Sequence, residues 1–172
     1  MAELYVPEKG LTETQDSSVQ EFLNRRGIDF EKWEANFSFD YDADQETILK
    51  AYDHQIRPLM ESKGYQSADV INVHSQMENL QSLREKFLSE HTHSEDEVRF
   101  FVDGEGQFWF HLDNGEVFRV ICRTGDFISV PAGVKHWFDL APKYFVKAIR
   151  IFTSKEGWVA QYTHSGVEKN YL

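Results

Sequence analysis

Cysteine is nearly missing from this chain of 172 residues, in which Cys122 stands alone. A single thiol excludes an internal disulfide framework, a thiolate metal cluster and a CxxC redox pair. We therefore expect Cys122 to be a small buried hydrophobic side chain and not a nucleophile.

Positive charge is also scarce, since 18 Lys and Arg against 29 Asp and Glu give a formal net charge of -11. Nucleic acids and anionic membranes bind basic surfaces, so neither is expected as a partner. An anionic substrate would have to be attracted by local positive charge and not by the overall field.

Long hydrophobic runs are missing as well. No uninterrupted apolar stretch approaches the ~20 residues that span a bilayer. The opening MAELYVPEKG has no basic flank followed by an apolar run, so it does not resemble a signal peptide. We expect a cytoplasmic protein, and the charge together with the lack of an apolar helical stripe favours a monomer.

Apolar material is nevertheless ample, because hydrophobic residues make up 41% of the chain and aromatic residues 15%. This suits one domain with one packed core. In the first 90 residues the pattern favours helices: residues 17–26 show helical spacing and stop at Gly27. Asp44 is expected to cap a second helix, which Pro58 would kink or divide. Two further elements are expected, a strand over 68–74 and a short helix over 79–88.

Beyond residue 91 the period of the hydrophobic pattern shortens to that of β-strands, which are separated by tight turns. The glycines of residues 103–106 predict a turn, and Asn114-Gly115 predicts a two-residue type I′ hairpin, whose central positions both need positive φ. The expected strands cover 98–102, 107–112, 117–122, 127–130, 136–140 and 144–152. A mainly β fold follows, an antiparallel β-barrel or sandwich with the N-terminal helices packed outside.

Two histidines and a glutamate open this part, in the segment HTHSEDEVRF at 91–100. His91 and His93 are two residues apart, so on an extended backbone both imidazoles point to one face. Glu97 follows at even spacing and can join them if the backbone stays extended. These ligand types suit Fe(II), Ni(II), Mn(II) or Zn(II). Two solvated histidines in an acidic loop would give the same short pattern.

A second segment, GDFISVPAGVKHWF at 125–138, strengthens the metal interpretation. Residues 127–130 predict a strand, after which Pro131 and Gly133 fit the second and fourth positions of a tight turn. That turn would bring His136 from a neighbouring strand toward the other ligands.

The two segments resemble the two cupin motifs, in the runs His91-x-His93-x3-Glu97-x6-Gly104 and Gly125-x5-Pro131-x-Gly133-x2-His136. The longer strings EHTHSEDEVRFFVDGEGQFWF and GDFISVPAGVKHWFDL are similar to the acireductone dioxygenase family in particular. The resemblance implies one cupin domain over 1–172, with a jelly-roll barrel. Its parts would be a helical N-terminal part with one or two strands (1–90), a metal-binding barrel core (91–152) and a C-terminal extension (153–172).

By this resemblance one octahedral Fe(II) or Ni(II) per chain is implied, with two positions left for substrate oxygens. Its four protein ligands would be His91, His93, Glu97 and His136. The implied substrate is 1,2-dihydroxy-3-keto-5-methylthiopentene of methionine salvage, which is cleaved with O2. Iron would give formate and 4-methylthio-2-oxobutanoate. Nickel would give formate, carbon monoxide and 3-methylthiopropanoate.

Two arginines are candidates for catalytic roles. Arg99 lies two residues beyond Glu97 and is expected to face the same interior, where it would neutralise an anionic substrate or hold the carboxylate. The alternative is a surface arginine on an edge strand. Arg150 lies in KAIRIF, where both strand faces are apolar, so the pattern does not fix its direction. The resemblance places an arginine near the substrate here, and a structural ion pair would also fit.

Three aromatic residues are candidates for substrate contact. Phe138 shares strand parity with His136 and is expected to wall the pocket, and Phe87 and Trp158 are similar to pocket-lining aromatics of the family. Ordinary core packing is the alternative for all three. The histidines without a partner pattern are expected to lie outside the site: His54, His74, His111 and His164.

Two other functions remain open. Another cupin enzyme, an isomerase or a dioxygenase acting on a different enediol or phenol, would share the metal ligands. A non-catalytic cupin that binds or stores a small molecule would keep the barrel, but it has no need of a complete ligand set.

Overall fold

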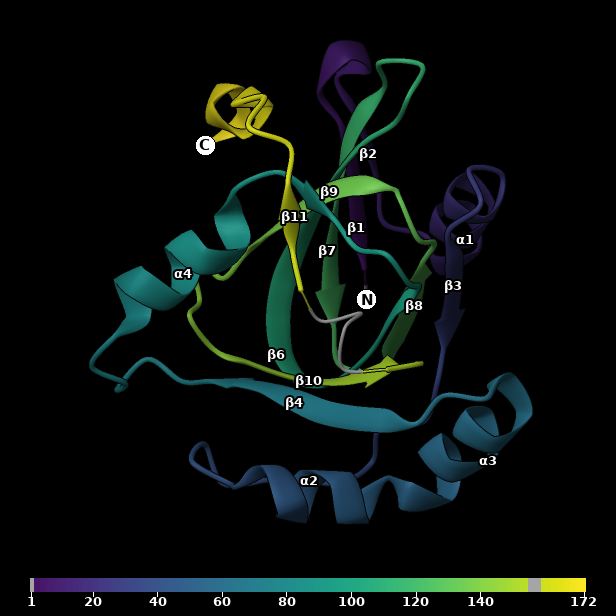
Figure 1. The fold of residues 1–172 in the computed structure, drawn as a ribbon, viewed down its shortest axis with the longest axis vertical. Helices are drawn as coiled ribbons and strands as arrows, with labels where there is room; N and C mark the ends of the chain where they lie inside the picture. Colours follow the sequence, from purple (N-terminus) through teal and green to yellow (C-terminus); the bar gives the residue numbers. More distant parts are fainter. Residues whose placement is uncertain (1, 155–158) are drawn as a thin grey trace.

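The strands of the second half close into an antiparallel β-barrel, and the helices lie outside it (Figure 1). The computed structural model describes residues 2–154 and 159–172. The strands are β1 (Glu3–Val6), β2 (Leu11–Glu13), β3 (Asp29–Lys32), β4 (Ser67–Val73), β5 (His91–Thr92), β6 (Glu97–His111), β7 (Val117–Arg123), β8 (Asp126–Val130), β9 (Lys135–Asp139), β10 (Val146–Phe152) and β11 (Gln161–Tyr162). The helices are α1 (Asp16–Asn24), α2 (Gln45–Ala51), α3 (Asp53–Lys63) and α4 (Leu80–Leu88), with 3-10 turns η1 (Pro7–Lys9) and η3 (Val167–Tyr171).

Two faces of the barrel share the long strand β6. One face has the strand order β11-β5-β9-β6-β7-β1-β2, and the other has β4-β10-β6-β8-β3. The first part of β6 pairs with β10 and β8, and its second part pairs with β7 and β9. A strand that changes partners along its length joins two faces into one rolled sheet.

The turn expected at residues 103–106 is wrong, because β6 runs through it. Gly104 has a φ of 71°, and the pairing of β6 with β10 slips by one residue between Lys147 and Ala148. A glycine bulge bends a strand without ending it, since partners on both sides keep it in the ladder. The slip and Gly104 therefore lie next to the point at which β6 changes sheet partners.

Two other turns differ from the prediction by a residue. The hairpin between β6 and β7 is confirmed, but its loop has three residues, 113–115, closed by the bond from Leu112 N to Glu116 O. Only Gly115 has a positive φ there, at 88°, which suits a bulged loop and not a type I′ turn. After β8, Val134 N donates to Pro131 O, so Gly133 is the third residue of that turn, with a φ of 83°.

The N-terminal part holds the expected helices and more strands than expected. The Asp44 side chain caps α2 by accepting from Thr47 N, as predicted. The helical segment is divided at Tyr52, whose side chain is fully buried, and α3 continues past Pro58. The strands β1, β2, β3 and β4 all precede residue 91, where one or two were expected. Strands of three or four residues give too little alternation to be recognised.

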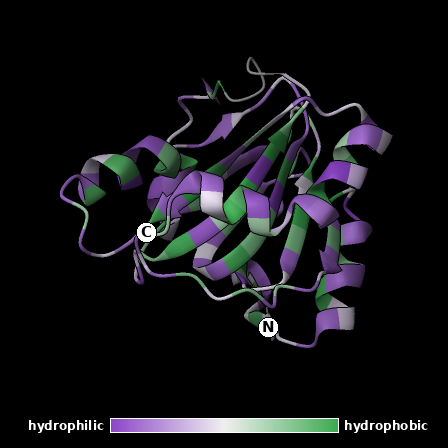
Figure 2. Cartoon of the chain, turned by 90° about the horizontal axis from the view of Figure 1, so that it is seen from below, coloured by the Kyte–Doolittle hydropathy of each residue, from purple (hydrophilic) through white to green (hydrophobic). Residues whose placement is uncertain are grey.

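Alternation along β6 separates an inner core from an outer one. Phe101 points into the barrel with other aromatic side chains, whereas Val98 and Phe100 pack outside against Ile48 of α2 and Ile56 of α3. Figure 2 shows most of the hydrophobic colour on the central strands, and the outer helices are largely hydrophilic. The period of two places residues 97 and 99 on the inner face with Phe101.

Cys122 belongs to the inner core and is fully buried, as predicted. Burial raises the pKa of its thiol well above the ordinary value, so the thiolate is disfavoured at neutral pH. Among the described residues, every helix is too short or too polar to cross a membrane.

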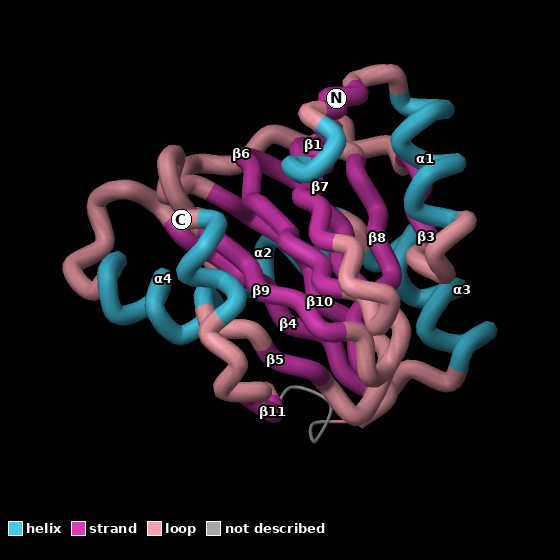
Figure 3. Tube along the Cα trace, turned by 90° about the horizontal axis from the view of Figure 1, so that it is seen from above, coloured by secondary structure: helices cyan, strands magenta, loops and turns pink. Residues whose placement is uncertain are grey.

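The C-terminal segment returns to the end of the barrel that carries the histidines. β11 pairs with β5, so that Tyr162 faces His91 across the ladder. Figure 3 shows β11 beside β5 at the rim. Tyr171 of η3 then packs on Trp109 and Trp137, which lie on the outer side of β6 and β9.

Gly106 lies in β6 directly against the ring of Phe138 in β9, and a Cβ at this position would overlap that ring. We expect Gly106→Ala to lower the free energy of unfolding by about 1–3 kcal/mol, as overpacking does in a dense core. Urea denaturation measures the loss. The same substitution in a Phe138→Leu background should cost much less, and an equal cost in both backgrounds would contradict the overlap as its cause.

Candidate functional site

Three imidazoles meet inside one end of the barrel. His91 lies in β5 and faces His136 of β9 across the ladder, and His93 follows directly after β5. The ring centroids are 4.5 Å apart for His91 and His136, 5.0 Å for His91 and His93, and 5.3 Å for His93 and His136. One nitrogen from each ring lies within 4.8 Å of the other two, and all three residues are buried. The two segments named from the sequence therefore converge.

The outer nitrogen of each imidazole is held by a backbone carbonyl. Nδ1 of His91 lies 2.7 Å from Ser89 O, Nδ1 of His136 lies 2.8 Å from Val134 O, and Nδ1 of His93 lies 3.2 Å from Val159 O. A carbonyl oxygen only accepts, so each Nδ1 donates, and Nε2 is the ring nitrogen left to bind a ligand. Such bonds fix the orientation of histidine ligands in metal sites.

Glu97, at the start of β6, completes the cluster. Its Oε2 lies 3.0 Å from Nε2 of His136 and 3.2 Å from Nε2 of His93. Imidazole nitrogens and a carboxylate oxygen that converge in a buried space can hold a cation between them. Nitrogen and oxygen donors of this kind suit divalent iron, nickel, manganese or zinc. The residues present therefore fit a metal.

The protonation states agree with that use. Burial lowers the pKa of His91 to about 3, so its imidazole is neutral at neutral pH. Burial alone would raise the pKa of Glu97, but Arg99 and the bonds to His136 and His93 outweigh it and hold that pKa well below its ordinary value. The cluster offers neutral imidazole and an ionised carboxylate.

Arg99 faces the interior beside Glu97, as predicted, and is 2% exposed. Its Nε donates to Glu97 Oε1 at 2.8 Å, and its guanidinium lies over the rings of Phe108 and Phe138, at 4.7 and 4.4 Å from their centroids. Nη1 is buried and has no hydrogen-bond partner among the described residues. A buried guanidinium N–H without an acceptor is costly, so its position indicates a ligand that supplies the acceptor.

Arg150 also faces inward, which the sequence left undecided. It lies in β10 directly opposite Arg99 of β6, and it forms a bidentate ion pair with Asp69 of β4, with Nε–Oδ1 at 2.8 Å and Nη2–Oδ2 at 2.5 Å. It also lines the cavity next to the histidines. The ion pair considered from the sequence is therefore present, and the role of Arg150 toward a substrate stays a prediction.

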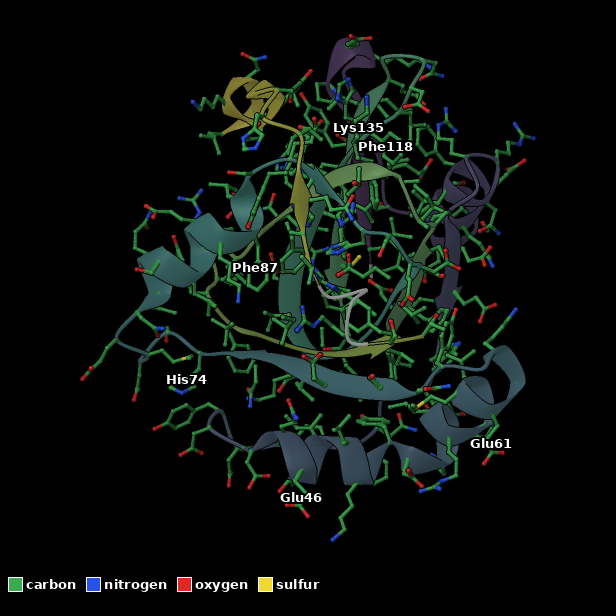
Figure 4. All side chains as sticks on the ribbon, viewed as in Figure 1. Glu46, Glu61, His74, Phe87, Phe118 and Lys135 are labelled. Carbon is green, nitrogen blue, oxygen red and sulfur yellow. The ribbon has the colours of Figure 1, made fainter. Side chains whose placement is uncertain are left out.

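A cavity of about 380 Å³ opens above this cluster. Besides His91, His93, Glu97 and the two arginines, it is lined by Lys86, Phe87, Val159, Ala160 and Tyr162. The side chain of Phe87, in the last turn of α4, lies on the side of the helix that packs against the barrel (Figure 4). Phe138 lies one layer deeper, where it supports the Arg99 guanidinium and contacts the ring of Phe87 edge-on. Trp158, also expected at the pocket, lies outside the described residues.

Several residues of the site region were not found from the sequence. Asp69 lies on the inner face of β4, and only its even spacing from Ile71 and Val73 could have indicated this. Tyr162 and the carbonyl of Val159 come from a segment without a recognisable pattern, more than 60 residues along the chain from His93.

Glu90 anchors the same C-terminal segment. Its carboxylate accepts from Thr163 Oγ1 at 2.6 Å and Ser165 Oγ at 2.8 Å, and its other oxygen lies 2.7 Å from Nδ1 of His111. His111, which was expected to lie outside the site, contacts Glu90, the residue directly before His91. Burial favours the neutral form of Glu90, but these bonds outweigh it and lower its pKa.

Comparisons with known proteins agree with this geometry. The model of the ARD/ARD' family matches residues 8–160 of this chain. The acireductone dioxygenase of Picosynechococcus sp. is 54% identical over 171 residues, which cover 99% of this chain and 97% of that protein. That of Enterobacter sp. is 47% identical over 158 residues, covering 92% of this chain and 87% of that protein.

A solved structure is similar over nearly the same length. It is an acireductone dioxygenase from Bacillus anthracis with a cadmium ion in its active center. The TM-score is 0.84 at 35% sequence identity, and the match covers 94% of this chain and 98% of that one.

Proposed function

This chain belongs to the ARD/ARD' family, and from that premise we infer that it is an acireductone dioxygenase of methionine salvage. In this proposal the enzyme cleaves 1,2-dihydroxy-3-keto-5-methylthiopentene with O2 and uses a divalent metal. The observation that carries the proposal is the buried cluster of three imidazoles and a carboxylate, set below a cavity lined by two arginines. The ligands proposed for the metal are His91, His93, Glu97 and His136.

In this proposal the metal and the two arginines bind different parts of the negative charge of the substrate. Fe(II) or Ni(II), one per chain, would supply a positive charge for the enediolate oxygens and a redox centre for O2. Arg99 and Arg150 neutralise the remaining negative charge of the substrate and fix its orientation. The free Nη1 of Arg99 is the donor available for a substrate oxygen.

The apolar part of the cavity suits the rest of the substrate. Phe87 offers an aromatic face to the thioether tail, since sulfur packs favourably on aromatic rings. Phe138 holds Arg99 in place from below. Trp158 is proposed as a further contact. The burial of the cluster limits the access of water to the reacting carbons.

The experiment that tests the proposal is removal and replacement of the metal. Protein treated with a chelator is reloaded with Fe(II) or with Ni(II) and then supplied with the acireductone and O2. We expect formate and 4-methylthio-2-oxobutanoate from the iron sample, and formate, carbon monoxide and 3-methylthiopropanoate from the nickel sample. No acceleration over the uncatalysed oxidation in either sample, despite stoichiometric metal, would move the function to another substrate of a cupin enzyme. Tight binding of a small molecule without turnover would indicate a non-catalytic cupin.

We further propose that the enzyme is a cytoplasmic monomer, as its charge and composition favour. Sedimentation of the metal-loaded protein over a range of concentrations measures the oligomeric state. A mass well above the 20.2 kDa of one chain that persists on dilution would contradict a monomer.

A further inference from the structure

We propose that Asp69, which lies outside the cavity, is a positioning residue for substrate binding. It holds Arg150 beside Arg99, so that two guanidiniums together receive the anionic substrate. The inference rests on the proposed function, because it concerns how the acireductone is bound.

The strand register places three charged residues in one line across the sheet. Asp69 of β4 pairs with Arg150 of β10, and Arg150 pairs with Arg99 of β6. Directly opposite residues in neighbouring strands point to the same side. That side is the inner face, because Ile71 of β4 and Ala148 of β10 lie in the inner core at the same parity.

The contact between Asp69 and Arg150 is a two-point contact. Both guanidinium nitrogens that face β4 are bonded to the two oxygens of Asp69, at 2.8 and 2.5 Å. The two side chains are 15% and 16% exposed, so the pair is largely shielded from water. A bidentate pair fixes the plane and the direction of a guanidinium as well as its charge. Asp69 is not among the described residues that line the cavity, so it would act on the substrate without touching it.

The electrostatic arrangement explains why such a partner is needed. Like charges directly opposite each other in a sheet are destabilising, and Arg99 and Arg150 are in that position. Glu97 forms an ion pair with Arg99, and Asp69 forms an ion pair with Arg150. One carboxylate stands on each side of the two arginines. Asp69→Asn would remove the carboxylate that fixes the direction of the Arg150 guanidinium beside Arg99.

The consequence is a specific kinetic effect. An anion seated between the two guanidiniums would be bound more weakly once Arg150 points elsewhere, whereas the metal ligands would be untouched. We therefore expect Asp69→Asn in the metal-loaded enzyme to raise KM for the acireductone about tenfold or more, as for loss of a charge-assisted contact. The value of kcat should change far less. Titration with the acireductone under anaerobic conditions should show the same loss of affinity without turnover.

Three further variants separate positioning from folding. Asp69→Glu keeps the charge and should restore part of the affinity. Arg150→Gln should raise KM as Asp69→Asn does, and adding Asp69→Asn to it should raise KM no further, because the two residues act as one unit. Glu116→Gln breaks the Arg26 pair, which has a similar exposure of 18% and 22% and lies away from the cavity, and should leave KM unchanged.

Each other result overturns the inference. An unchanged KM and affinity in Asp69→Asn would show that Arg150 does not need Asp69 to bind the substrate. If adding Asp69→Asn to Arg150→Gln raises KM as much as it does in the wild type, Asp69 does not act through Arg150. In both cases the wild-type enzyme still turns over the acireductone. A wild-type protein that neither binds nor consumes it would instead overturn the proposed function, and this inference with it.

Discussion

Glu97→Gln is expected to reduce metal-dependent turnover by more than about 100-fold, beyond the usual cost of losing an outer partner of a metal ligand. The substitution keeps the shape of the side chain and removes the charge that faces His93 and His136. It also leaves the buried guanidinium of Arg99 without its carboxylate. Breaking a buried ion pair from one side costs about 3–5 kcal/mol, so the metal-free protein should unfold at lower urea concentration.

Metal content and stability are measured separately for this variant. The amount of bound metal per chain after reloading reports on the ligand, and urea denaturation of metal-free protein reports on Arg99. Glu61→Gln is the matched control, because Glu61 is exposed on α3, outside the barrel (Figure 4). A Glu97→Gln variant with full metal content and wild-type turnover would exclude Glu97 as a ligand.

Arg99→Leu is expected to lower kcat/KM by about 10²–10³-fold, the range seen when a donor aimed at developing or bound negative charge is removed. The leucine removes the unpartnered Nη1 and the counter-charge of Glu97 together. In the metal-free protein the Glu97 carboxylate would then be buried without its cation, which destabilises the fold by several kcal/mol (about 3–5 kcal/mol).

A bound metal should reverse part of that loss of stability. The difference in urea midpoint between metal-loaded and metal-free protein is therefore expected to be larger for Arg99→Leu than for wild type, because binding to the folded state stabilises it. Arg99→Lys keeps a positive charge but not the planar fork, and should recover stability more than kcat/KM. Equal activity of wild type and Arg99→Lys would contradict a directional role for the guanidinium.

Most helices and strands could be predicted from local sequence signals. The exceptions have a common cause, which is that contacts between distant parts of the chain decide them. Asp44 caps α2 because a cap depends on the residues next to it. The turn at residues 103–106 was wrong because two glycines permit either a turn or a bulge, and only the partners of β6 decide between them. The helical segment breaks at Tyr52 and not at Pro58, and Tyr52 is fully buried in the outer core, a tertiary contact that local spacing does not show.

In the candidate site too, residue spacing predicted some contacts and the tertiary structure alone determined others. Even spacing placed Glu97 and Arg99 on one face, and the structure has them in contact there. For Arg150 both faces of its strand are apolar, so spacing could give no direction. The hydrogen bonds from His93 to the carbonyl of Val159 and from Thr163 to Glu90 join residues that no short-range pattern connects.

The sequence by itself indicated the candidate metal ligands of this protein, because donor types and their spacing in two short segments are local properties that can be recognised without coordinates. His91, His93, Glu97 and His136 could be named for that reason. Only the tertiary structure decided how the positive charge beside them is arranged. The register of β4, β10 and β6 brings Asp69, Arg150 and Arg99 into one row. Register is set by the closure of the whole barrel, and a shift of one residue would turn every one of these side chains to the outer face.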